Sequence, residues 1–157
     1  MRKRIINSVH KQNVYSDQNW LDIEKLAVAE VTSEDDAYPI ESALLPGNDS
    51  GWRASSPGEQ MIRLLFDNPQ RLQWIRLNFE ELDIERTQEY VLRWSSDGGY
   101  SYQEIIRQQW NFSPEGATSE IEEYEVDLPA VTILELGINP DISKKNAFAS
   151  LSELRLA

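Results

Sequence analysis

Alternation of apolar and other side chains in several short segments is the feature that most constrains how this chain can fold. The alternation is clearest at residues 61–66, 74–79 and 90–95, where every second side chain is large and apolar. Successive side chains of a β-strand point to opposite faces of a sheet, so the pattern predicts strands with one buried face. No long segment shows the spacing of an amphipathic helix.

Turn-forming residues separate these segments. Asp67-Asn68-Pro69-Gln70 predicts a turn between the first two strands, and Ser96-Asp97-Gly98-Gly99 supplies the positive-φ residues that a tight hairpin needs. Pro129 predicts the end of a strand in which Tyr124, Val126 and Leu128 alternate with acidic residues on a wet face. Further strands are predicted at residues 100–107, 131–138 and 151–156.

The N-terminal third is less regular. Residues 1–19 are polar and aperiodic and predict an arm, which leaves residues 20–157 as one domain. Residues 20–31 favour a strand near 25–32, with a helix as the alternative, because apolar residues occupy parts of both faces. Residues 41–57 are rich in Ser, Gly, Pro, Asn and Asp, which predicts loops rather than core. Together the segments predict an all-β fold, an antiparallel jelly-roll β-sandwich of about eight strands.

Charge and composition narrow the class of partner. Twenty-seven acidic and fifteen basic side chains give a formal charge of −12, which disfavours nucleic acid and anionic membranes. No apolar stretch approaches the roughly twenty residues that span a bilayer, and no export signal follows Arg2-Lys3-Arg4. Cysteine is absent. A cytoplasmic location is expected, although a piece of a larger secreted protein would have the same composition.

The sequence offers little for catalysis. His10 is the only histidine and lies in the predicted arm, and there is no nucleophile motif or Gly-rich phosphate loop. Acidic pairs such as Glu122/Glu123 are interpreted as solvated surface. We therefore expect a binding protein and not an enzyme.

Four segments, taken in order, resemble the discoidin, or coagulation-factor C-type, domain. Residues 41–52 resemble the family's Ala-Leu-Asp-Gly loop that ends in Trp, and residues 61–79 resemble its paired strands. Residues 90–98 are similar to its strand-to-hairpin signature, which Tyr102 follows, and residues 151–156 resemble its last strand. The likeness covers about residues 25–157 and implies the galactose-binding-like fold, with ligand-binding loops at one end of the sandwich.

Sugar recognition calls for aromatic faces and planar polar side chains, and the predicted loops contain both. Each aromatic candidate has a structural alternative: Trp52 packs against the sandwich in the domains that it resembles, and Trp110 can be buried under its loop. Arg93 lies on a strand, where a solvated face is the alternative. The candidate ligand-binding residues are Trp52, Arg53, Trp110, Asn111, Tyr38 and Arg93.

The resemblance also implies a structural calcium ion, which the family's loop helps to hold through an Asp before its Gly. Here Pro46 precedes Gly47, but a calcium site can still be assembled from Asn48, Asp49, Ser50 and Glu153 with loop carbonyls. Simple turn hydrogen bonds are the alternative role of Asn48 and Asp49.

Two functional classes follow. The first is a non-catalytic carbohydrate-binding module that uses loops at one end of the sandwich. The second is a protein-interaction or assembly domain that uses the same loops or an acidic surface.

Overall fold

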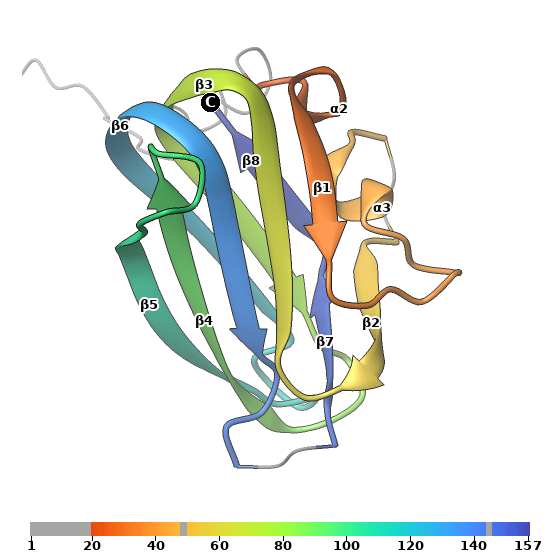
Figure 1. The fold of residues 1–157 in the computed structure, drawn as a ribbon. Coiled ribbons are helices and arrows are strands. Elements are labelled where there is room, and N and C mark those ends of the chain that lie inside the picture. Colours follow the sequence, from red (N-terminus) through yellow and green to blue (C-terminus); the bar gives the residue numbers. More distant parts are fainter. Residues whose placement is uncertain (1–19, 48–49, 144–145) are drawn as a thin grey trace, which may run out of the picture.

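The computed structural model describes residues 20–47, 50–143 and 146–157, so the predicted arm at residues 1–19 lies outside the described residues. The described chain is an antiparallel β-sandwich with two one-turn helices (Figure 1). No helix in these ranges is long and apolar enough to cross a membrane. The elements are α2 (Ile23–Leu26), β1 (Ala27–Val31), α3 (Glu41–Leu44), β2 (Trp52–Pro57), β3 (Gln60–Glu80), β4 (Arg86–Ser95), β5 (Gln103–Phe112), β6 (Ser119–Asn139), β7 (Phe148–Leu151) and β8 (Glu153–Leu156).

Strands β3 and β6 are long and take part in both layers of the sandwich. Residues 60–65 of β3 pair with residues 133–138 of β6, and residues 72–80 pair with residues 119–128. Irregular register between Leu65 and Trp74 joins the two ladders, and both strands arch there (Figure 1). The predicted turn at residues 67–70 is therefore a bend inside one strand. Pro129 does not end β6, because the ladder resumes at Val131.

The two layers are built around this bent pair. The larger sheet has the order β1-β3-β6-β4-β5, and β8 pairs with the second half of β3. Strands β2 and β7 form a separate ladder of two strands. The prediction of an antiparallel sandwich of about eight strands is confirmed.

The core lies between the layers and follows the period-two pattern. Ile62, Leu64 and Leu92 are at most 1% exposed, as are Leu77 and Phe79 from the second half of β3. The rings of Phe79 and Tyr90 stack with centroids 4.9 Å apart. Each such buried side chain contributes roughly 1.5–3 kcal/mol, so the alternating positions carry much of the stability.

The N-terminal third departs most from expectation. The predicted strand near residues 25–32 is present as β1, directly after the one-turn helix α2. The prediction that residues 41–57 form loops outside the core is wrong. This region contains α3 and β2, and its residues Ala43, Leu44 and Trp52 are buried in the core. The guanidinium of Arg155 donates to the carbonyl oxygens of Ala43 and Leu45 at 2.9 and 3.2 Å. These bonds satisfy carbonyls at the end of α3.

Charged residues alternate in sign along one row of the outer face of the larger sheet. We call Glu30, Arg63, Glu135, Arg93 and Glu104 the charge row; they are direct cross-strand neighbours on β1, β3, β6, β4 and β5. The carboxylate of Glu135 lies at its centre and accepts hydrogen bonds from Arg63 at 3.0 Å and Arg93 at 2.5 Å. Opposite charges placed directly across strands stabilise their pairing and help to fix its register.

Candidate functional site

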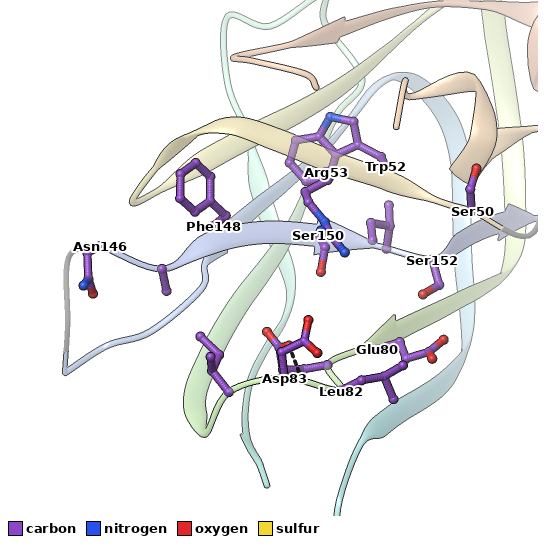
Figure 2. A pocket seen from close by; sticks show the side chains of 14 residues that line it. Ser50, Trp52, Arg53, Glu80, Leu82, Asp83, Asn146, Phe148, Ser150 and Ser152 are labelled. Carbon is purple, nitrogen blue, oxygen red and sulfur yellow. Dashed lines mark hydrogen bonds between the residues drawn. The ribbon is translucent and has the colours of Figure 1, made fainter. Parts of the chain in front are cut away.

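A hollow of about 390 Å³ opens at one end of the sandwich, where three segments distant in sequence meet. Its upper wall is the β2–β7 ladder, and its lower wall is the segment 80–84 after β3 (Figure 2). We call it the loop-end hollow. Its volume lies within the range of small-ligand sites.

Gly51 allows the backbone before β2 to lie close to the end of β7 in the upper wall. Its φ is +70°, and a Cβ there would lie 2.7 Å from the carbonyl oxygen of Leu151. The next residue, Trp52, pairs with Leu151 and is only 1% exposed. The indole N–H of Trp52 donates to the carbonyl oxygen of Ser33 at 3.1 Å. This burial favours a structural role for Trp52, packed against the sandwich, although Trp52 is also one of the residues that line the hollow.

Arg53 is exposed and lines the hollow from the same strand. Its guanidinium carbon lies 4.5 Å from the centre of the Tyr38 ring. Backbone bonds fix the pair, since the N–H of Arg53 donates to the carbonyl oxygen of Tyr38 at 3.1 Å and the N–H of Asp35 donates to that of Arg53 at 2.8 Å. The structure thus brings three predicted residues, Tyr38, Trp52 and Arg53, to one end of the sandwich.

Carboxylates line the lower wall of the hollow; in Figure 2 Asp83 lies beneath Ser150, and Glu80 lies beneath Ser152. Glu81 accepts hydrogen bonds from the Asp83 N–H at 3.0 Å and from Arg86 at 2.7 Å. Burial opposes the ionisation of Glu81, but these bonds and the Arg86 charge outweigh it and lower the pKa of Glu81.

Arg86 is the residue that holds the loops together. It is buried, lies 4.7 Å from the Phe112 ring centre, and donates to Glu81 and, at 2.9 Å, to the carbonyl oxygen of Pro140. The segment after β3 is therefore tied to the segment after β6. Neither Arg86 nor the lining residues Asp83, Asn146 and Phe148 were among the sequence candidates. Leu82 and Ile84, two apolar residues between the strands predicted at 74–79 and 90–95, were the available signal.

The other predicted residues lie elsewhere. Trp110 does not open a loop: β5 continues to Phe112, and Trp110 pairs with Gln88 while packing half-buried against the core. Asn111 is also within β5, and its side-chain amide oxygen accepts a hydrogen bond from the Thr87 hydroxyl at 2.7 Å. Arg93 belongs to the charge row and lies on the outer face of the larger sheet.

The predicted calcium ligands are only partly described. Asn48 and Asp49 lie outside the described residues. The Glu153 carboxylate makes ion pairs with Arg76 at 3.4 Å and Arg155 at 3.6 Å. Within residues 20–47, 50–143 and 146–157, no group of three or more acidic or histidine side chains could hold a metal ion.

Comparison with known proteins identifies similar structures but no similar sequences. No protein-family model matches the sequence, and no curated protein matches it. Among solved structures, a family 32 carbohydrate-binding module (CBM32) of NanJ from C. perfringens, in complex with galactose, has a TM-score of 0.59 and 16% identity, covering 87% of this chain and 96% of that one. A CBM32 of a Clostridium perfringens GH89 protein, in complex with GalNAc-β-1,3-galactose, has a TM-score of 0.63 and 17% identity, covering 88% and 99%.

A third solved structure is the CBM32 of AlyQ in complex with 4,5-unsaturated mannuronic acid, with a TM-score of 0.63 and 15% identity over 88% of this chain and 97% of that one. At such identities the likeness establishes the fold. This chain has the galactose-binding-like, or discoidin-like, β-sandwich fold that these family 32 modules share.

Proposed function

We propose that this chain is a non-catalytic carbohydrate-binding module and that the loop-end hollow is its sugar site. The observation that carries the proposal is the set of side chains gathered there. An aromatic ring, Phe148, is 46% exposed and lines the same hollow as Arg53, Asp83 and Asn146. Aromatic rings stack on the C–H faces of sugars, while planar polar groups hold their hydroxyls.

The similar structures support a sugar as the ligand. The NanJ module is in complex with galactose and the GH89 module with a GalNAc-containing disaccharide. Fold alone does not assign a ligand, so the argument depends on the side chains of the hollow.

The ionisation of Glu81, one of the acidic residues that line the hollow, supports a role without catalysis. A glycosidase needs a carboxyl group that keeps its proton until the leaving group takes it. Glu81 has a lowered pKa and is held by Arg86, so it is ionised and poorly suited to that role. Arg86 instead fixes the wall against which a ligand would lie.

A glycan-array screen of the purified chain, with and without calcium, tests the proposal. We expect selective binding to a neutral glycan, and a calcium-dependent response would identify the predicted ion. For the best glycan, Arg53→Ala and Phe148→Ala should each raise the Kd at least tenfold, measured by calorimetry. Arg71→Ala is the matched control, because Arg71 is exposed, lies outside the lining of the hollow and forms an ion pair with the exposed Asp127.

Melting temperatures separate binding from folding. Both site variants should melt within a few degrees of the parent, because their side chains are largely exposed. If no glycan binds under either condition, the sugar proposal fails and a protein partner becomes the better hypothesis. Association with that partner should then weaken with added salt if acidic side chains dominate the contact.

A further inference from the structure

A second hollow, of about 410 Å³, lies on the outer face of the larger sheet. Residues of β3, β4, β5 and β6 line it, and it shares no lining residue with the loop-end hollow. We call it the sheet groove. It borders the charge row, since Arg93 belongs to both.

The groove exists because a central strand lacks a side chain at one position. Gly137 of β6 pairs with Met61 of β3 on one side and Val91 of β4 on the other. A Cβ at Gly137 would meet nothing within 4 Å, so the space above it is open. Glycine weakens a strand interior and often marks a place where a ligand approaches the backbone.

Polar side chains on the β4–β5 side of the groove are held in place by neighbouring residues of the protein. Arg107 donates to Glu89 at 2.8 Å and to Glu104 at 3.0 Å, and Gln109 donates to Glu89 at 2.8 Å. Arg93 is fixed by the buried Glu135. Side chains ordered before binding lose less entropy when a ligand arrives.

The charges of the groove define the chemistry that fits it. Two carboxylates, Glu59 and Glu89, and two guanidiniums, Arg93 and Arg107, line the groove. The near balance favours neither an anion nor a cation. A guanidinium carries five N–H donors, so an arginine already paired with a carboxylate can still donate to a hydroxyl. Met61 and Val91 add apolar floor for C–H groups.

The backbone under the groove is already paired, which disfavours an added peptide strand. Gly137 lies in ladders with both β3 and β4, whereas strand addition requires an unpaired sheet edge. Recognition must therefore come from side chains. We propose that the sheet groove is a second binding site, for a neutral, hydroxyl-rich saccharide chain.

Gly137→Val tests this site without touching the loop-end hollow. The substitution places a branched side chain in the open space, and valine is a good strand former, so the fold should persist and the melting temperature should not fall. Gly137→Ala is a graded control that fills less of the groove. Binding is followed by amide NMR shifts of the full chain with galactotetraose, cellotetraose and mannotetraose, and with tetragalacturonate as the acidic arm.

We expect at least one neutral tetrasaccharide to shift the amides of Val91, Arg107 and Gly137. In Gly137→Val the Kd measured from the groove amides should rise at least fivefold, with a smaller rise in Gly137→Ala. Shifts confined to residues 50–53 and 80–84 would overturn the groove site and leave the loop-end proposal standing. Shifts confined to the groove amides would support the groove site and overturn the loop-end proposal. Absence of groove shifts with every neutral probe, or a preference for tetragalacturonate, overturns the proposal.

Discussion

Two buried glutamates on the same strand, β6, have opposite surroundings. Glu135 is 2% exposed and lies on the outer side of the larger sheet, between Arg63 and Arg93. Glu120 is 1% exposed and faces the interior, where the amide of Gln88 is a neighbour and none of the described cations forms an ion pair with its carboxylate. Its cross-strand neighbour is the core residue Phe79.

The burial of Glu120 without a cationic partner changes its pKa. Burial, followed by the charge of Glu122, raises its pKa to about 7, while Gln88 opposes the shift. A carboxylate can be buried as an ion when cations flank it, but otherwise it tends to keep its proton. We infer that the outer charge row favours the fold at neutral pH and that the interior acid opposes it.

The largest effect should come from making Glu135 resemble Glu120. The double variant Arg63→Met/Arg93→Met leaves Glu135 buried without its cations, and removing the partners of a buried charge costs about 3–5 kcal/mol. Urea unfolding at pH 8 should show this loss. Adding Glu135→Gln should restore most of the stability, and a loss below about 1 kcal/mol would contradict the role of the row.

Replacing Glu120 should stabilise the protein at neutral and higher pH. Its native pKa of about 7 exceeds the unfolded value near 4.5, so the native state holds a proton that the unfolded state releases in this window. Stability therefore falls as pH rises from about 4.5 to 7. Glu120→Gln should raise the free energy of unfolding at pH 8, on the order of 2 kcal/mol, with little change at pH 4.

Glu122→Gln is the matched control for the interior acid. It removes a neighbouring negative charge that raises the pKa of Glu120, so it should stabilise in the same direction by less. Equal stabilities of the parent and Glu120→Gln across pH 4–8 would show that Glu120 titrates normally.

The smallest effect should come from the end of the charge row. Glu30 is 55% exposed and lies 3.4 Å from Arg63. Water and salt screen such pairs, so Glu30→Gln should cost less than about 0.5 kcal/mol and nothing measurable in 1 M salt. A large loss would mean that the row acts as one unit and not through its buried centre.

Prediction from sequence succeeded where the signal is local. The inward positions of β3 and β4 follow from alternation alone, and the Asp97-Gly98-Gly99 hairpin follows from turn chemistry, with φ of +75° at Gly98 and +99° at Gly99. It failed where packing overrides local signals. Pro129 lies in a bend of β6 that the partner strand bridges, and β2 is a strand because β7 pairs with it.

Only part of the candidate site was predicted, again because sequence patterns are local. Tyr38, Trp52 and Arg53 are close in sequence to one predicted turn region, so reasoning by loops found them. Asp83 and Phe148 are far from that region in sequence. Arg86 anchors the segment of Asp83 through Glu81, and the pairing of β7 with β2 places Phe148 at the hollow.

The sequence by itself determined that the chain is all-β, which side chains face the core, and where the tight hairpin lies. Each depends on residues a few positions apart, whose periodicity and turn preferences are local properties. Only the tertiary structure decided that Glu135 lies between Arg63 and Arg93, while Glu120 is buried without an ion pair to any residue that the structure describes. Register between distant strands depends on packing of the whole sandwich, because a shift of one residue would turn every side chain to the other face.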